Sequence, residues 1–242
     1  MDNISSLSIL PGVPYAKLSN LSLNHPLNVM SVTLQPGQHL LSAAIAEASR
    51  IVSETGELPR LKVIAKALGV KKEMLKTVIF DRNHLLVVMA DVALQRLLHT
   101  ITQQMSGCSS PVDQLERIAF AYIDWARLYP QEFRLIEEMP RAVFEAHPRL
   151  LQYELSVHDL VLKILQRAQE EGYLDQDEDL IMLRAMSHTY LFGVITKMML
   201  GVLNRWTSGS SDHEAARTAV RAFSRKLFKP ERAGSRDNLG PA

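Results

Sequence analysis

Basic side chains gather in one short stretch of this sequence, and their chemistry suits the phosphates of a nucleic acid. Between residues 57 and 84, seven cations stand with three carboxylates, so the stretch carries a charge of +4 in a chain whose total charge is +1. Lysine and arginine bind phosphate oxygens through charge-assisted hydrogen bonds. The cations are Arg60, Lys62, Lys66, Lys71, Lys72, Lys76 and Arg82. The stretch is a candidate nucleic-acid contact, although a charged helix face is also a common solvated surface.

No arrangement of side chains in the sequence predicts catalysis. The chain lacks a glycine-rich phosphate loop, a G-x-S-x-G nucleophile motif and an H-E-x-x-H zinc motif. The histidines are scattered and do not show the spacing of metal ligands, among them His84, His99, His147, His158 and His188. The single cysteine, Cys108, excludes an intramolecular disulfide and a multi-cysteine metal site. The sequence therefore predicts a binding protein that is not an enzyme and has no metal site and no cofactor.

Composition indicates a folded protein with a large core. The chain has 242 residues, of which 47% are hydrophobic, enough for one large or two small domains. The N-terminus has no basic segment before an apolar run, and no apolar stretch approaches the length of a membrane span. We therefore expect a cytoplasmic protein that does not enter a membrane.

The basic residues fall on a helix-turn-helix pattern. Apolar residues recur at helical spacing from Leu61 to Leu68, Gly69 marks a turn, and the spacing resumes at Leu75. Glycine adopts the left-handed backbone of such a turn at little cost. A longer amphipathic helix is predicted before the pair, over residues 39–55, and another after it, over residues 84–105. Four helices in the order long, short, short, long therefore bracket the basic stretch.

Residues 40–98 resemble the N-terminal domain of TetR-family transcriptional repressors. That pattern has an alanine-rich first helix ending in glycine, an Ile-Ala pair, a Gly-Val turn, a recognition helix and a later Leu-Leu pair. The matching residues are Ala43, Ala44, Gly56, Ile64, Ala65, Gly69, Val70, Leu75, Leu85 and Leu86. The resemblance implies an all-α fold of about nine helices, in which a three-helix helix-turn-helix DNA-binding domain precedes a helical ligand-binding and dimerisation domain.

The recognition helix departs from the family pattern. The Ser or Thr that usually caps the second helix is Arg60, and the tyrosine of the recognition helix is Lys76. The following aromatic is Ile79, with Phe80 displaced by one position, and the lysine that opens the fourth helix is Arg82. Lys76 replaces a phosphate-contacting hydroxyl by a positive charge. Binding to an atypical operator and much weaker binding are both open alternatives.

The resemblance also implies how the protein binds DNA. A homodimer places two recognition helices, at residues 71–79, in successive major grooves of a palindromic operator. The residues that we expect to contact double-stranded DNA are Lys62, Lys71, Lys72, Glu73, Met74, Lys76, Thr77 and Arg82. The predicted function is a ligand-responsive DNA-binding transcriptional regulator that acts as a repressor. The alternative is a helical sensor or protein-interaction module of the same fold that has lost operator binding.

The last two thirds of the sequence are predicted to be helical, over residues 111–129, 131–138, 148–171, 177–206 and 212–228, the last capped by Asp212. Helical bundles hold small molecules in apolar cavities with a few polar groups. The residues expected to line such a cavity, for a small apolar ligand, are Trp125, Tyr129, Phe133, Tyr153, His158, Met186 and Tyr190. Ordinary core packing of the same side chains is the alternative.

The final two long helices are the predicted dimer interface. In the family they pair with those of a second subunit as a four-helix bundle, and glycines on them let backbones approach closely. The expected interface residues are Tyr190, Gly193, Lys197, Met198, Gly201, Val220 and Phe223. The predicted domain boundaries are a flexible arm at 1–37, the helix-turn-helix domain at 38–84, the ligand-binding and dimerisation domain at 85–229 and a disordered tail at 230–242.

Overall fold

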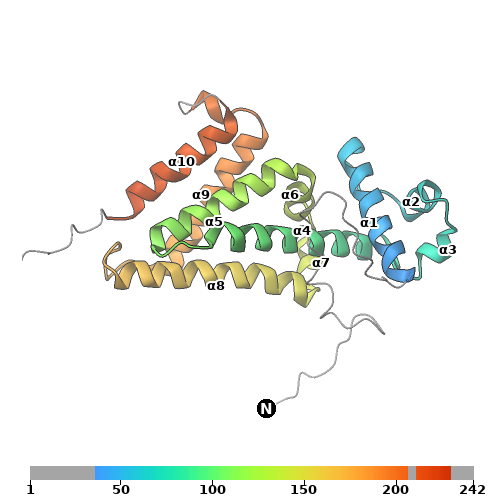
Figure 1. Ribbon diagram of the computed structural model, residues 1–242, viewed down its shortest axis with the longest axis horizontal. Coiled ribbons are helices and arrows are strands. Elements are labelled where there is room, and N and C mark those ends of the chain that lie inside the picture. The colour runs from blue at the N-terminus through green and yellow to red at the C-terminus, as the bar shows by residue number, and fades with distance from the viewer. Residues whose placement is uncertain (1–35, 207–210, 230–242) are drawn as a thin grey trace, which may run out of the picture. The chain divides into compact units, whose positions relative to one another are not determined.

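Ten α-helices and one 3-10 helix make up the described part of the chain, residues 36–206 and 211–229, and that part contains no β-strand. Figure 1 draws this computed structural model. The predicted all-α fold is confirmed. The predicted tail and all but the end of the predicted arm fall outside the described residues. The described residues from Gly37 onward belong to one compact unit.

The first four helices have the predicted order of long, short, short, long: α1 (Pro36–Thr55), α2 (Leu61–Ala67), α3 (Lys72–Leu75) and α4 (Arg82–Met105). They share a small apolar core, to which they contribute Ala44, Ile64, Leu75 and Leu85 in that order. Between α2 and α3, Gly69 has a φ of 66°. A side chain would disfavour that backbone, so glycine allows the tight reversal between the two short helices.

Seven further elements follow: α5 (Pro111–Leu128), α6 (Pro130–Glu137), α7 (Arg141–Glu145), α8 (Pro148–Glu170), α9 (Leu180–Met199), η2 (Leu203–Arg205) and α10 (Asp212–Leu227). Proline opens α5, α6 and α8, where its missing N–H interrupts no hydrogen bond within the helix. The helix α7 is absent from the sequence prediction, because five residues are too few to display helical periodicity.

The prediction of a single helix over residues 177–206 is wrong. α9 begins only at Leu180, because Asp179 caps it by accepting hydrogen bonds from the backbone N–H groups of Ile181 and Met182, each at 3.0 Å. The helix ends two residues before Gly201, whose φ of 66° turns the chain toward η2. Gly201 therefore has a structural role as a helix terminator.

The predicted cap of the final helix is also wrong. Ser211 caps α10, since its hydroxyl oxygen accepts a hydrogen bond from the backbone N–H of Glu214 at 3.2 Å. Asp212 is instead the first helical residue, and its Oδ1 accepts from the backbone N–H of Asn204 at 2.9 Å. That bond joins η2 to the start of α10.

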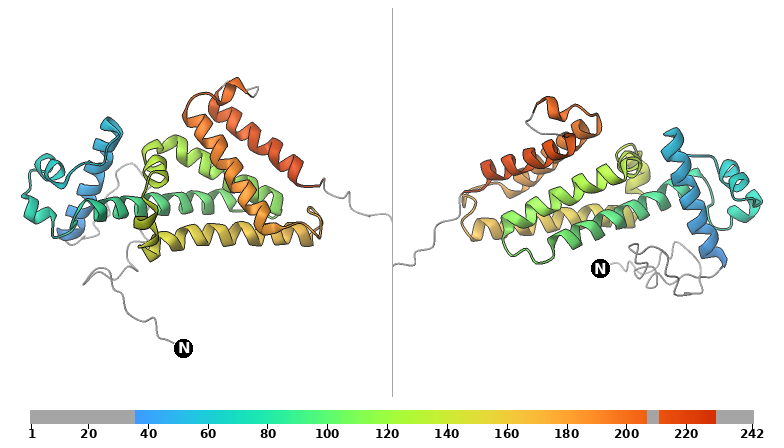
Figure 2. Two further views of the ribbon diagram at one scale, coloured as in Figure 1. Left: turned by 180° about the vertical axis from the view of Figure 1, so that it is seen from behind. Right: turned by 45° about the horizontal axis from the view of Figure 1, so that its top comes forward.

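The largest core lies among α4, α5, α9 and α10. In Figure 2, α9 and α10 form a neighbouring pair and α4 runs beside α8, in agreement with the contacts between these helices. By length and mean hydropathy alone, α4 is apolar enough to cross a membrane. Seven of its side chains are buried, so core packing accounts for its apolar character. The predicted domain boundary after residue 84 falls inside this continuous helix.

Candidate functional site

All eight residues predicted to contact DNA are solvent exposed, on or next to α2, α3 and the first residue of α4. Beneath them, Leu75 and Ile79 have no exposed surface, whereas Met74 keeps 54% of its surface exposed. Each short helix thus turns its apolar side inward and its lysines outward. The exposed lysines Lys62, Lys71, Lys72 and Lys76 are together called the basic face below, and the helices that carry them share this apolar core.

The helices of the basic face lack side-chain caps. Arg60 precedes α2 and Lys71 precedes α3, and neither side chain accepts a hydrogen bond from the helix that follows. α3 has only four residues. Just beyond it, the Thr77 hydroxyl donates to the carbonyl of Met74 at 2.7 Å. The recognition element is therefore a single short turn of helix followed by a hydrogen-bonded turn.

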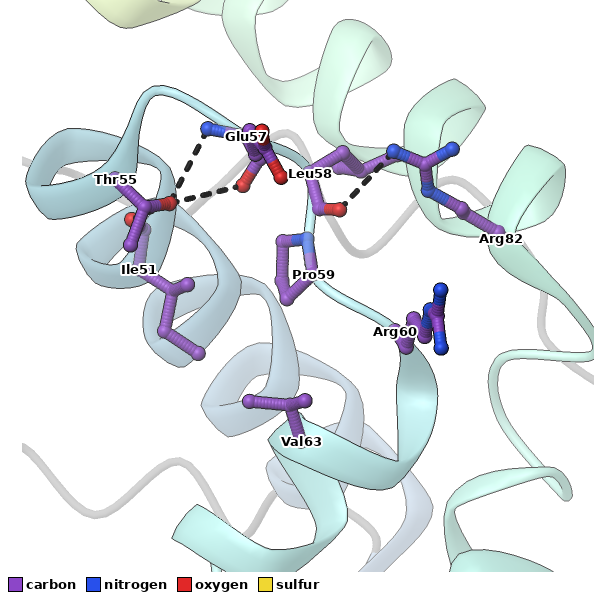
Figure 3. A pocket seen from close by; sticks show the side chains of 8 residues that line it. All are labelled: Ile51, Thr55, Glu57, Leu58, Pro59, Arg60, Val63 and Arg82. Carbon is purple, nitrogen blue, oxygen red and sulfur yellow. Dashed lines mark hydrogen bonds between the residues drawn. The ribbon is translucent and has the colours of Figure 1, made fainter.

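An open pocket of about 550 Å³ lies at the loop between α1 and α2 (Figure 3). Arg82 reaches this loop from the start of α4, and its Nη2 donates to the carbonyl of Leu58 at 3.1 Å. At the end of α1, the Thr55 hydroxyl oxygen accepts from the backbone N–H of Glu57 at 3.2 Å. Arg82, predicted to contact DNA, thus uses one N–H to hold the loop.

A larger cavity, of about 620 Å³, is lined by residues of α4 to α10. Three of the seven predicted ligand-contacting residues line it: Tyr153 and His158 of α8 and Tyr190 of α9. Most of its other lining side chains are aliphatic or aromatic. A cavity of this size and character falls within the range of about 300–1,000 Å³ that is usual for small-molecule sites.

The other four predicted ligand residues lie outside that lining. Trp125 is 1% exposed, its indole N–H donates to Glu132 Oε2 at 3.0 Å, and Phe133 packs edge-on against its ring. Tyr129 is exposed, with an arginine guanidinium of α4 lying 4.2 Å from its ring centroid. Met186 is 55% exposed on α9. In this chain, Trp125 and Phe133 belong to the packed core.

Polar side chains that the sequence analysis did not single out for the cavity also line it: Glu137, Glu154, Ser187, His188 and Ser224. The sequence contains one signal that could have identified Glu154 as a cavity residue. Glu154 lies four positions before His158, and residues four apart share a helix face. The rings of His158 and His188 lie 5.8 Å apart, edge to face. Within residues 36–206 and 211–229, no three His, Cys, Asp or Glu side chains could together hold a metal ion.

Burial and charge alter the titration of these cavity groups. Burial lowers the pKa of His188, His158 lowers it further, and the Glu154 carboxylate acts in the opposite direction. Burial and then the Glu137 and Glu154 carboxylates raise the pKa of Tyr122. Near neutral pH, His188 is therefore uncharged and the Tyr122 hydroxyl keeps its proton.

Four of the seven residues predicted at the dimer interface pack within the chain. Met198 and Val220 are buried in the large core. Tyr190 stacks on Phe223, with ring centroids 4.3 Å apart, and its hydroxyl donates to the carbonyl of Ala219 at 3.0 Å. These contacts join α9 to α10 in one chain.

Of the other three, Gly193 and Lys197 lie on α9 outside this core, and Gly201 follows the end of the helix. A Cβ added to Gly193 would meet no atom within 4 Å, the Lys197 ammonium lies 5.0 Å from the ring centroid of Trp206, and Gly201 ends the helix. Four large apolar side chains on or next to α9 keep more than half of their surface exposed: Ile181, Met182, Met186 and Leu200. This group is called the α9 apolar face below.

Neither a protein-family model nor a curated protein sequence matches the chain. Solved structures do match it. A protein of unknown function from a Rhodococcus species has a TM-score of 0.67 and 21% identity, over 81% of this chain and 100% of that one. The TetR-family regulator PfmR from Thermus thermophilus has a TM-score of 0.57 and 18% identity, over 77% and 99%. AibR, solved with isovaleryl coenzyme A and operator DNA, has a TM-score of 0.58 and 15% identity, over 79% and 99%.

These structural similarities define the fold class: an all-α protein in which an N-terminal helix-turn-helix precedes a larger helical region. The fold is that of the TetR-family transcriptional regulators, a non-enzymatic class to which several of the matching structures belong. The resemblance drawn from residues 40–98 is confirmed at the level of the fold. Since the identities stay below 25%, the comparisons show the fold alone.

Proposed function

We propose that this chain is a ligand-responsive DNA-binding transcriptional regulator, a cytoplasmic homodimer that represses from a palindromic operator. The observation that carries this proposal is the basic face, which places four exposed lysines over a fixed apolar support. Charges on a rigid support keep their spacing when they meet a regular array of phosphates. Residues 57–84 carry a charge of +4 in a chain whose total charge is +1, so the attraction for phosphates is concentrated in this stretch.

At the operator, the two copies of α3 enter successive major grooves. Lys71, Lys72 and Lys76 neutralise phosphates. Glu73 and Met74, together with Thr77, lie closest to the base edges, where hydrogen-bonding and methyl contacts distinguish sequences.

The α9 apolar face supports dimerisation. One side of α9 packs in the chain's own core through Leu183, Val194 and Ile195, while the opposite side exposes large apolar side chains. A helix that is apolar all round is usually covered on every side. A second copy of the same face covers it in an isologous contact, as two-fold symmetry requires. Gly193, which has open space beyond it, lets the two helices approach closely.

The helix α4 supports communication between ligand and DNA. Leu85 and Met89, near its start, belong to the apolar core that holds the basic face. Leu94 and Leu97, farther along, line the large cavity. A ligand that favours one position of α4 therefore shifts the separation of the two basic faces, provided that it binds one conformation more tightly than the other. AibR, of the same fold, was solved with both a small molecule and operator DNA.

A mobility-shift assay with DNA from upstream of the chain's own gene tests the proposal. We expect a discrete complex at low salt that weakens steeply at higher salt, because each neutralised phosphate releases counterions. An unrelated duplex of the same length serves as the control. Equal binding to both duplexes, or binding that does not respond to salt, overturns operator recognition.

A second function is favoured by the uncapped helices of the basic face. Arg60 and Lys71 supply no side-chain cap, and α3 has four residues, so the recognition element is less firmly held than a capped helix. A dimeric helical sensor or protein-interaction module that has lost operator binding would retain the cavity and the α9 apolar face. No salt-dependent complex with any genomic duplex, in a chain that still dimerises and binds a ligand, would establish this second function.

A further inference from the structure

The large cavity combines an apolar wall with carboxylates. Glu137 ends α6 and Glu154 lies on α8, and both line the cavity, as does Glu116 of α5. Burial and the nearby Glu154 carboxylate raise the pKa of Glu137, while a hydrogen bond from Tyr122 opposes that change. Two carboxylates that act on each other in this way would both be stabilised by a cation placed beside them.

One cavity cation acts on this pair, because the Glu154 carboxylate interacts electrostatically with Arg141 and helps to raise its pKa. Among the cavity arginines, Arg141 is bound to Glu145 with Nε and Oε1 2.6 Å apart. Arg184 of α9 also lines the cavity, yet it does not contribute to the pKa change of Glu137. Within residues 36–206 and 211–229, neither Glu137 nor Glu154 forms a salt bridge. No cation is among the causes of the pKa change of Glu137, so Glu137 is the carboxylate of the pair that is left for an entering cation.

Two hydroxyl groups point to a ligand independently of the carboxylates. Ser224 of α10 lines the cavity and is only 4% exposed, and its hydroxyl has no hydrogen-bond partner in the described residues. The buried hydroxyl of Ser187 on α9 lines the same cavity and, within the same residues, also lacks a partner. A buried polar group without a partner is costly, and a bound molecule with a hydrogen-bonding group would satisfy it.

We propose that the cavity binds an apolar organic cation, a lipophilic amine, with its ammonium group at Glu137 and Glu154. The apolar body of the ligand lies along the aliphatic wall, beside the rings of Tyr122 and Tyr153, which also line the cavity. A fatty acid or another apolar anion would instead bring a carboxylate toward two of the same charge. This ligand class rests on the proposed function, in which the cavity is the effector site.

Three ten-carbon probes that differ in head group test the proposal: decylammonium, decanol and decanoate. Their dissociation constants are measured by isothermal titration calorimetry on the full chain without DNA, at neutral pH and below micelle-forming concentrations. We expect decylammonium to bind at least about tenfold more tightly than either of the others, because it alone carries a charge opposite to that of the two glutamates.

The combined Glu137→Gln and Glu154→Gln variant removes both charges and keeps the side-chain shapes. It should lose at least about tenfold in affinity for the cation, while its affinity for decanol stays within about threefold, which shows that the cavity is intact. Glu170→Gln is the matched control, since Glu170 is an exposed glutamate on the same helix as Glu154. Its affinity for the cation should equal that of the unmodified chain.

Three results overturn the proposal: decanoate that binds as tightly as the cation, a double variant that keeps full affinity for the cation, or no binding of any probe. The assay contains no DNA, so a failure of operator binding leaves a positive result standing. A chain that binds its operator but shows no preference for the cation loses only this ligand class, not its proposed function.

Discussion

The basic face and the large cavity are built in opposite ways. The residues of the basic face are exposed and come from one stretch, residues 62–76, held by a small core beneath them. The residues of the cavity come from helices that span most of the remaining chain, and many of them also pack in the large core. Substitutions at the basic face should therefore alter function without altering stability, whereas substitutions around the cavity should often alter both.

The helix α4 joins the two regions. Leu85 is fully buried beneath the basic face, and Leu97, 3% exposed, lines the cavity farther along the same helix. A helix is stiff along its axis, so a displacement at one end can be transmitted to the other. The comparison thus separates three properties that can be changed one at a time: core stability, DNA binding and ligand binding.

The largest effect is expected in the core. Trp125→Ala should lower the free energy of unfolding by about 3–5 kcal/mol, because it leaves a cavity and removes the indole donor from Glu132. Urea unfolding followed by circular dichroism measures the change. Tyr129→Ala, at an exposed aromatic of the adjacent turn, is the control and should cost about 1 kcal/mol or less. Equal losses in the two variants would contradict the placement of Trp125.

At the basic face, the combined Lys71→Ala, Lys72→Ala and Lys76→Ala variant should bind the upstream duplex at least about a thousandfold more weakly at low salt. Six cations are lost per dimer, so the slope of log affinity against log salt should fall by about 5. Thermal unfolding should be unchanged. Fluorescence anisotropy of a labelled duplex measures both the affinity and the slope.

The control for that variant removes three exposed cations elsewhere, with Lys163→Ala on α8 and Arg225→Ala and Lys226→Ala on α10. Its DNA affinity should stay within about threefold of the unmodified chain, because these charges are not on the basic face. A similar loss in both variants would mean that net charge, not the basic face, determines DNA binding.

The α9 apolar face provides the next test. Met182→Glu with Met186→Glu should raise the dissociation constant of the dimer at least about a hundredfold, since each subunit would bury two uncompensated charges. Sedimentation equilibrium measures the change. Leu128→Glu places a charge at a side chain that is 57% exposed on α5 and should leave the dimer intact. A dimer that tolerates the double substitution would have to use another surface.

The smallest effect is a pH dependence of ligand binding. The pKa of Glu137 is raised by burial and by Glu154, so its carboxylate ionises at a higher pH than an ordinary glutamate. Affinity for decylammonium should therefore rise severalfold as the pH increases from about 5 to 7, and then level off. Burial raises the pKa of Tyr122 and lowers that of His188 at the same cavity. The other ionisable side chains that line it are Glu116, Arg141, Glu145, Tyr153, Glu154, His158, Arg184 and Tyr190. Glu137→Gln should flatten the profile in the same calorimetric titration.

The N-terminal helices were the most predictable part of the chain, because their positions depend on local spacing. The four N-terminal helices and the exposure of the basic residues follow from apolar periodicity and from one turn glycine, Gly69. The end of α9 was missed, because an apolar run continues past the point where Gly201 reverses the chain. Periodicity alone does not reveal where an apolar segment stops being helical.

The cavity could be predicted only in part, because periodicity shows that a helix face is buried but not what it faces. Trp125 and Tyr153 both lie on inward faces of long helices, yet the first packs in the core and the second lines the cavity. Glu137 and Glu154 lie on different helices with α7 between them in the sequence. Their meeting at one cavity wall depends on tertiary packing, which spacing within one helix does not encode.

The most direct test of the central claim is the number of chains that bind one operator duplex. Sedimentation velocity of the full chain with a fluorescently labelled upstream duplex measures this ratio at low salt. We expect two chains per duplex, because the α9 apolar face pairs two basic faces on one DNA. One chain per duplex, or a protein and a duplex that sediment separately, would contradict the claim that this chain is a dimeric DNA-binding regulator.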